Sequence, residues 1–321
     1  MFPKDAHSVR ELRAELARKI AWFIGFSERQ VTQVPGLLLA RRTSPTVPCS
    51  GTYEPSLIVV AQGRKRVDLG QTTFIYDESR FLLTSVALPI VAQVVEASES
   101  KPCLAMALKL EMPIVRELLT REEILAHELP SGSHAMVTGE ITPELLSACC
   151  RLLDLLSTPQ HILFLAGVIQ REIIYRLLCG PEGGRLRAIA TLGDHSNRTA
   201  KAIAWIRDNY AKPVRVDELA GIAGMGVSTL HHHFRVLTNM SPLQYQKQLR
   251  LQAARGRMLI DGIDATTAAF EVGYESVSQF NREYSRFFGQ PPMRDVRTLR
   301  APDAPPMESI ARQSPRTRTV A

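Results

Sequence analysis

The chain has 321 residues and a formal net charge of +7, a length that accommodates two domains with separate cores. The charge is uneven, because residues 1–180 hold 19 Lys and Arg against 19 Asp and Glu, whereas residues 181–321 hold 20 against 13. A neutral half followed by a basic half indicates a module that binds a polyanion, joined to a module with another task.

Membrane proteins and disulfide-rich secreted proteins are disfavoured. The first predicted helix is charged and no run of 18 apolar residues occurs, so we expect no signal peptide, no membrane partner and a cytoplasmic location. The five cysteines lack C-x-x-C spacing, which favours reduced thiols over a disulfide framework or a zinc site. They are Cys49, Cys103, Cys149, Cys150 and Cys179.

The first half of the chain opens with a helix and continues with strands. Ser8 and Glu11 form a capping-box pattern at the start of an amphipathic helix that extends to Phe23. Between Gly36 and Glu111, seven short runs rich in Val, Ile, Leu and Thr alternate with turn residues, which predicts a small antiparallel barrel or sandwich. The runs are LLLAR, SLIVVAQ, KRVDL, TFIYD, RFLLTSV, IVAQVVE and CLAMALKL.

Helices return after the strands. We expect a helix over 112–126, a loop over 129–139 and two helices over 143–156 and 159–178, each of these two opened by a Thr-Pro pair. The apolar faces of that helical hairpin are broader than one barrel needs, so dimerisation and packing on the barrel would account for them equally well. The Gly-rich stretch 179–184 then predicts a linker.

Two copies of one pattern fill the second half. In the later copy a short apolar helix leads to Gly273, and the next helix carries Phe280, Tyr284, Phe287 and Phe288 on one face. The same apolar spacing occurs 50 residues earlier, which predicts two helix-turn-helix units joined by a helix about 27 Å long. The units cover 217–238 and 265–288, and the joining helix covers 242–260.

These repeats resemble a known family. The stretches MGVSTLHHHFR, MSPLQYQKQLRLQAAR and VGYESVSQFNREYSRFFG match the pattern of the AraC/XylS class of bacterial transcription regulators. The stretch YEPSLIVVAQGRKRVDLG is similar to the N-terminal domain of one subgroup, and the resemblance implies a cupin-like barrel there. Two residues depart from the pattern: Gly226 replaces the usual N-capping Ser, and Asp295 stands where many members have an aromatic residue.

Pattern and resemblance together predict an α+β fold. Residues 1–184 are expected to form an effector-sensing, cupin-like antiparallel β-barrel with the helical hairpin. Residues 198–298 are expected to form an all-α double helix-turn-helix domain for DNA binding. Residues 301–321, which hold four prolines and three arginines, are expected to be a disordered tail.

Base-reading residues are expected on the outward face of each recognition helix, because side chains there reach base edges in the major groove. Arg282 is the prime candidate for a bidentate contact to guanine, and Val277 for a contact to a thymine methyl. The predicted DNA-binding set is Ser228, Thr229, His232 and Arg235 in the first unit, with Val236 beside them, and Val277, Ser278, Gln279, Arg282 and Arg286 in the second. The alternative is that each of these is an ordinary polar residue at the protein surface with no role in DNA binding.

Other polar residues give weaker signals. His231, His232 and His233 do not predict a metal site, because neighbours on a helix point about 100° apart. Four basic residues of the joining helix are candidates for DNA-backbone contacts or ordinary solvated charges: Lys247, Arg250, Arg255 and Arg257.

The barrel gives little sign of catalysis. No histidine occurs between Ser8 and Ala126, which disfavours a metal-using cupin, and we expect neither a metal nor a cofactor. Cys49 and Cys103 either sense electrophiles or are inert buried thiols. Six polar residues are candidates to line an effector site: Tyr53, Glu54, Gln62, Lys65, Tyr76 and Glu96.

The sequence therefore predicts a ligand-responsive transcriptional regulator, not an enzyme, that reads two adjacent major-groove segments of double-stranded DNA. Expected partners are a second copy of the chain, an unknown small-molecule effector and, for an activator, RNA polymerase. The predicted linker would let dimers bind repeated sites with flexible spacing. The alternatives are a metal-free barrel enzyme or carrier fused to a DNA-binding module, and an architectural DNA-binding protein without a ligand.

Overall fold

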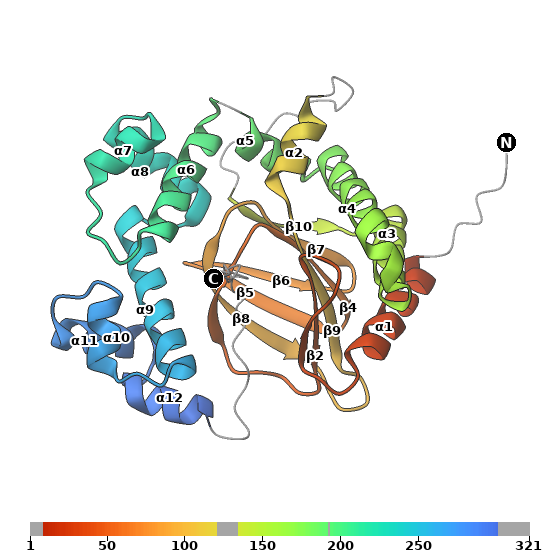
Figure 1. The fold of residues 1–321 in the computed structure, drawn as a ribbon, viewed down its shortest axis with the longest axis horizontal. Coiled ribbons are helices and arrows are strands. Elements are labelled where there is room, and N and C mark those ends of the chain that lie inside the picture. Colours follow the sequence, from red (N-terminus) through yellow and green to blue (C-terminus); the bar gives the residue numbers. More distant parts are fainter. Residues whose placement is uncertain (1–8, 121–133, 192, 301–321) are drawn as a thin grey trace, which may run out of the picture.

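A β-barrel lies at the centre of the molecule, with helices on two sides of it (Figure 1). The computed structural model describes residues 9–120, 134–191 and 193–300. The predicted capping residue Ser8, parts of the predicted 112–126 helix and 129–139 loop, and the whole predicted tail lie outside the described residues.

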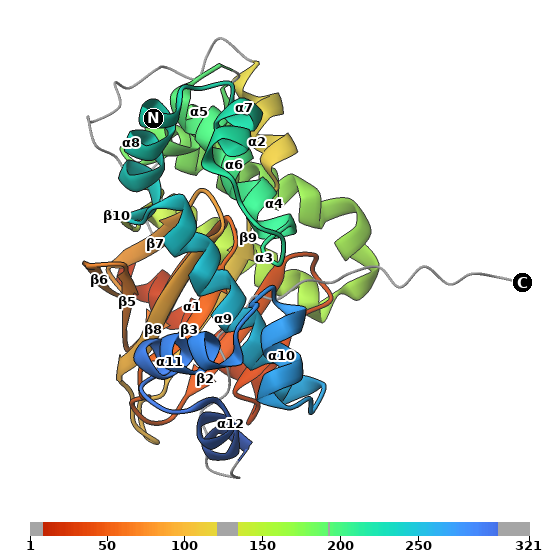
Figure 2. The same ribbon diagram turned by 90° about the vertical axis from the view of Figure 1, so that its left-hand side faces the viewer.

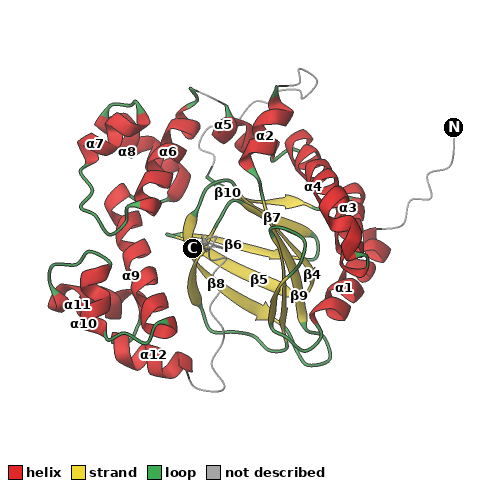
Figure 3. Ribbon diagram, in the orientation of Figure 1, coloured by secondary structure: helices red, strands yellow, loops and turns green. Residues whose placement is uncertain are grey.

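The barrel consists of two antiparallel sheets that curve around a shared interior (Figure 3). The strand order is β1-β2-β9-β4-β7-β10 in the first sheet and β3-β8-β5-β6 in the second. The strands within the described residues are β1 (Arg29–Val31), β2 (Leu37–Arg42), β3 (Cys49–Tyr53), β4 (Ser56–Gln62), β5 (Arg64–Leu69), β6 (Thr72–Asp77), β7 (Arg80–Thr84), β8 (Leu88–Glu96), β9 (Cys103–Lys109) and β10 (Met136–Glu140).

All seven predicted runs are strands, and the predicted antiparallel barrel is confirmed. Sequence reasoning missed β1, β3 and β10, and the loop predicted over 129–139 is wrong where β10 occupies it. The MVTGE sequence of β10 lacks a clear apolar alternation. It becomes a strand because it pairs with β7 along its whole length, from Met136 opposite Thr84 to Glu140 opposite Arg80.

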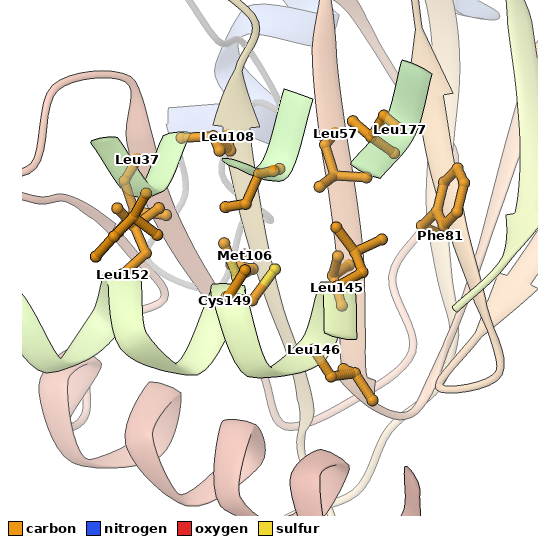
Figure 4. Packing of buried hydrophobic residues seen from close by; sticks show 14 of the residues in the cluster. Leu37, Leu57, Phe81, Met106, Leu108, Leu145, Leu146, Cys149, Leu152 and Leu177 are labelled. Atoms are coloured by element: carbon orange, nitrogen blue, oxygen red, sulfur yellow. The ribbon is translucent and has the colours of Figure 1, made fainter. Parts of the chain in front are cut away.

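A helical layer covers the outer face of the first sheet. It includes α1 (Val9–Ile24) and α3 (Pro143–Asp154), which pack together. In Figure 4, Leu145 and Leu152 of α3 point toward Leu57 and Leu37 of the sheet. Burial of each leucine contributes about 1.5–3 kcal/mol. Packing on the barrel, rather than dimerisation, therefore accounts for the apolar face of α3.

The second helix of the hairpin, α4 (Ile162–Cys179), is apolar on both sides. Its inner residues Ile173 and Leu177 are buried in the same core, whereas Leu163, Phe164 and Val168 are 84%, 73% and 63% exposed. Packing on the barrel thus leaves an apolar stripe of α4 in solvent.

Thr142 caps α3 by accepting a hydrogen bond from the Leu145 amide, as the Thr-Pro pattern predicts. Thr158 makes no such side-chain cap, and a short 3-10 helix over Pro159–His161 precedes α4. Within the described residues no single helix is long and apolar enough to cross a membrane. The helices α3 and α4 reach the length and apolar composition of a membrane span only when they are taken together, and the chain is bent by 116° between them.

The linker predicted over 179–184 is wrong, because a helix, α5 (Gly183–Ala190), begins inside it. This helix packs on α2 (Met112–Leu119), α4 and α6 (His195–Asp208). Gly183 is buried, and a Cβ atom there would lie 2.1 Å from the carbonyl oxygen of Leu178. The glycine therefore permits close backbone packing rather than chain flexibility.

Seven helices form the C-terminal region within the described residues. The sequence analysis did not predict the last of them, α12, which begins at Pro292. Proline suits the first position of a helix, because an N–H group there would have no hydrogen-bond partner within the helix. In order they are α6, α7 (Val216–Ala223), α8 (Val227–Thr238), α9 (Pro242–Ile260), α10 (Ala265–Glu271), α11 (Val277–Phe288) and α12 (Pro292–Arg300).

The C-terminal helices pack directly on the barrel, and α9 runs across its strands (Figure 2). The Tyr245 side chain of α9 is fully buried, and its hydroxyl donates a hydrogen bond to the carbonyl oxygen of Ala87 at 2.7 Å. One hydrophobic cluster contains both Val67 of the barrel and Phe234 of α8. The barrel interior and the first helix-turn-helix unit therefore share a core.

Polar contacts reinforce this docking. Asn239, just after α8, donates from Nδ2 to Thr72 Oγ1 at 2.8 Å and to Leu69 O at 3.3 Å. Arg207 of α6 lies 3.2 Å from the Glu54 carboxylate. The expectation of a flexibly tethered DNA-binding module is therefore wrong, because the module is held against the barrel.

Candidate nucleic-acid interface

The first helix-turn-helix unit consists of α7 and α8. Leu230 and Phe234 of α8 are fully buried in the core. Val236 is half-buried, and its carbonyl oxygen lies 2.9 Å from His134 Nδ1 beside the barrel. The end of α8 thus faces the barrel and its first half faces solvent, which is the half that reads bases in helix-turn-helix proteins. The exposed residues include the predicted Ser228, Thr229, His232 and Arg235.

The second unit consists of α10 and α11. Ser276 caps α11 by accepting a hydrogen bond from the Gln279 amide at 3.3 Å. Phe280 and Tyr284 are fully buried, so the helical period turns the other side of α11 to solvent. Of the predicted residues there, Val277 is half-buried and the others are exposed: Ser278, Gln279, Arg282 and Arg286.

A surface depression of about 660 Å³ adjoins the outward face of α11. Arg282 and Arg286 line it together with Asn281 and Ser285, and Met293 of α12 forms part of its wall. Sequence reasoning missed Asn281 and Ser285, although they lie three residues after Ser278 and Arg282 and so share their side of the helix. The depression brings two guanidinium groups, an amide and a hydroxyl within reach of one ligand surface.

The three consecutive histidines of α8 occupy different surroundings. His232 is exposed, whereas His233 stacks on His195 of α6 with the ring centroids 4.4 Å apart. Burial, followed by the neighbouring rings of His195 and His232, lowers the pKa of His233. Among the described residues, no group of three His, Cys, Asp or Glu side chains could hold a metal ion.

Arg255 is not a candidate for a DNA-backbone contact, because its side chain is buried. Its guanidinium forms two hydrogen bonds of 2.8 Å with the Asp295 carboxylate and lies 4.4 Å from the Phe288 ring centroid. The Tyr284 hydroxyl also donates to Asp295 at 2.8 Å. Asp295, which departs from the family pattern, is thus the buried counter-charge of Arg255.

The other basic residues of α9 are mostly engaged with the protein. Arg250 donates hydrogen bonds to the backbone carbonyls that follow α6, so its guanidinium is engaged within the protein rather than freely solvated. Arg257 pairs with Glu271 at 2.7 Å. Lys247, which lies 4.0 Å from Glu283, has a side chain that is 45% exposed.

The six barrel candidates separate into two groups. Tyr53, Lys65 and Tyr76 are buried at 2%, 6% and 1% exposure, and Lys65 lies opposite Tyr76 across β5 and β6. The other three lie elsewhere: Glu54 pairs with Arg207, Gln62 donates to Pro102 O and Glu96 pairs with Arg64. Cys49 and Cys103 are buried and form no disulfide bond.

Family models match both halves of the chain. The AraC-type transcriptional regulator N-terminus matches residues 33–185, and a helix-turn-helix domain matches residues 219–298. Together with the two units seen in the structure, these matches place the chain in the AraC family of transcriptional regulators.

Curated relatives include the HTH-type transcriptional activator RhaS of Yersinia pestis and that of Yersinia pseudotuberculosis. Each is 30% identical over 105 residues, which is 33% of this chain and 38% of the relative. The chain thus matches well under half the length of these relatives.

Solved structures of ToxT from Vibrio cholerae share the fold of both halves. An apo form of a ToxT variant has a TM-score of 0.54 and 9% sequence identity, covering 84% of this chain and all of that one. A wild-type form bound to an unsaturated fatty acid has a TM-score of 0.52 and 9% identity, covering 81% and 93%. At such identity the likeness concerns the fold alone, and it confirms the α+β arrangement.

Proposed function

We propose that the chain is a transcriptional regulator, not an enzyme, that binds double-stranded DNA sequence-specifically through α8 and α11. The observation that carries this proposal is the pair of exposed polar recognition-helix faces joined by the single helix α9, in the half of the chain that holds the +7 charge. Activation through contact with RNA polymerase is in keeping with the relatives named activators. A cytoplasmic location follows from a DNA partner.

DNA selected from random sequence by the full chain tests the proposal. We expect affinity to fall as salt rises, because phosphate contacts release counterions. Arg282→Ala should weaken binding to the selected site by about 1–3 kcal/mol and relax the preference at one base pair. The control is Arg257→Ala, which removes an arginine engaged with Glu271 and should leave base preference unchanged. Binding without any sequence preference would contradict the proposal.

The effector is proposed to be an apolar molecule with an acidic group, held inside the barrel. ToxT, which shares the fold, binds an unsaturated fatty acid. Residues such as Ile58, Val60 and Leu82 pack in the barrel interior, and Lys65 of β5 is buried at 6% exposure. Because this interior shares a core with α8, a bound ligand would act directly on the DNA-binding module.

Titration of the full chain with an unsaturated fatty acid tests this class of effector. We expect the DNA affinity and the melting temperature to change, and the matched fatty alcohol to act more weakly because it lacks the charge. Equal effects of acid and alcohol would show that Lys65 does not select an acidic group.

The exposed stripe of α4 is proposed to hold a second copy of the chain. Phe164 and Val168 lie four residues apart and so share one side of α4, and Leu163 is exposed beside Phe164. Exposed apolar surfaces of this kind mark interaction sites. Phe164→Glu should convert the dimer to a monomer in analytical ultracentrifugation. Trp22→Glu on α1, where Trp22 is 82% exposed outside this stripe, should leave the dimer intact.

A further inference from the structure

A polar groove separates the two helix-turn-helix units along the first half of α9. Its volume is about 360 Å³, and its walls come from α9, the segment between α6 and α7, the turn before α11, and α11 itself. Its lining includes Lys247, Arg250, Gly273, Tyr274 and Glu283.

Arg250 contacts both units from its place on α9. Its Nε donates to Tyr210 O at 2.7 Å, and its Nη2 donates to Ala211 O at 3.1 Å and Lys212 O at 3.0 Å. These three carbonyls lie in the segment between α6 and α7, which leads into the first unit. The same guanidinium lies 5.8 Å from the centroid of the Tyr274 ring in the second unit, a cation–π contact.

Tyr274 continues this connection to the second recognition helix. Its hydroxyl donates to Glu283 Oε2 at 2.8 Å, and Glu283 is the only carboxylate of α11. The other carboxylate oxygen accepts from Gln279 Nε2 at 3.4 Å and lies 4.0 Å from Lys247 Nζ. A chain of polar contacts thus runs from the end of α6 to a predicted base-reading residue.

The two units also touch through their backbones in this groove. Gly273, in the turn before α11, approaches so closely that a Cβ atom there would lie 1.9 Å from Ala211 O and 2.9 Å from Arg250 Nη2. The turn of the second unit is therefore pressed against the Ala211 carbonyl, which Arg250 also binds. A rotation of either unit about α9 would break these contacts together.

We propose that Arg250, Tyr274 and Glu283 are positioning residues that fix the orientation of α11 relative to α8, and so make recognition depend on the number of base pairs between the two half-sites. The inference rests on the proposed function. One base pair moves a half-site by about 3.4 Å and rotates it by about 35°. A locked pair of units cannot follow that change, whereas a loosened pair can.

A spacing series tests the proposal. The site selected by the unmodified full chain is rebuilt with one base pair inserted or removed between the two contacted segments, and binding is measured by gel shift. We expect the unmodified protein to lose about 30-fold or more in affinity for each altered spacing, comparable to a mismatched contact. For the Arg250→Gln variant, the affinity for each altered spacing should be less than about 5-fold below its affinity for the original site. Arg257→Gln, on the same helix but outside the groove, should keep the steep dependence.

Two further measurements make the outcome decisive. Circular dichroism shows whether Arg250→Gln is folded, and if it is not, Tyr274→Phe takes its place, because this variant retains the ring and loses only the hydroxyl bond to Glu283. A spacing dependence as steep in the tested variant as in the unmodified protein overturns the positioning role. Failure of the unmodified protein to select any DNA sequence would instead remove the proposed function itself.

Discussion

Gly224 and Gly273 occupy equivalent places in the two helix-turn-helix units, yet their surroundings differ. Both have a left-handed backbone, with φ of 62° and 90°. Among the described residues, no neighbouring side chain or segment comes within 4 Å of a Cβ atom built on Gly224, whereas a Cβ on Gly273 would overlap Ala211 O at 1.9 Å. The sequence pattern shows both glycines. Only the structure shows that Gly224 is needed for the left-handed turn alone, whereas Gly273 is also needed for close packing against Ala211.

Substitution of these two glycines separates the two requirements. Gly224→Ala should lower the free energy of unfolding by about 1 kcal/mol, the cost of a left-handed alanine. Gly273→Ala should cost on the order of 3 kcal/mol or more, because the backbone must also move away from Ala211. Urea denaturation of the two variants measures the difference, and equal losses would contradict the close approach.

At the residue scale, helical periodicity correctly predicted that the polar DNA-facing residues of α8 and α11 are exposed. It failed for Arg250 and Arg255, because a long side chain can turn back into the protein and bury its stem and its charge when partners are present. Their partners are the carbonyls that follow α6 and the Asp295 carboxylate, which lie about 40 residues away in sequence. DNA binding by the exposed residues remains a prediction.

At the scale of elements, α12 closes the core of the second unit. Val296 of this helix packs in the cluster of α9, α10 and α11, and Asp295 binds Arg255 and Tyr284. Burial and the nearby Asp295 carboxylate raise the pKa of Tyr284, so its hydroxyl stays protonated and donates to Asp295. The buried ion pair of Asp295 and Arg255 therefore holds α12 at the end of the domain.

Removal of one partner of this pair tests its role. Asp295→Ala should destabilise the chain by about 3–5 kcal/mol, because it leaves the Arg255 charge buried without its partner. The double variant Arg255→Met with Asp295→Ala should recover most of that loss, since it removes the uncompensated charge. Urea denaturation provides the measurement, and a double variant no more stable than Asp295→Ala would contradict this explanation.

At the scale of the whole molecule, the DNA-binding module is docked on the barrel through α8 and α9. Ala135, beside the first residues of β10, donates its amide to Leu237 O at 3.0 Å at the end of α8. Asn239 combines a left-handed backbone, φ 58°, with its side-chain bonds to the β5–β6 turn. The barrel therefore holds the end of a recognition helix directly.

Asn239→Gly isolates the docking contact, because glycine keeps the left-handed backbone and removes the side chain. We expect faster hydrogen exchange of the Ala135 amide, since opening of the docked interface becomes easier. The Gly289 amide, which bonds to Ser285 O in the second unit, should exchange at an unchanged rate. Unchanged exchange at Ala135 would show that the docking does not depend on Asn239.

The sequence by itself determined the strands with apolar runs, the two helix-turn-helix units and the outward faces of their recognition helices. These features follow from local periodicity and capping, which depend on residues a few positions apart. The tertiary structure alone decided three others: strand β10, the helix in place of the 179–184 linker, and the inward course of Arg250 and Arg255. Each depends on partners far away in sequence, because strand pairing, close backbone packing and buried charges are satisfied only by the folded neighbourhood.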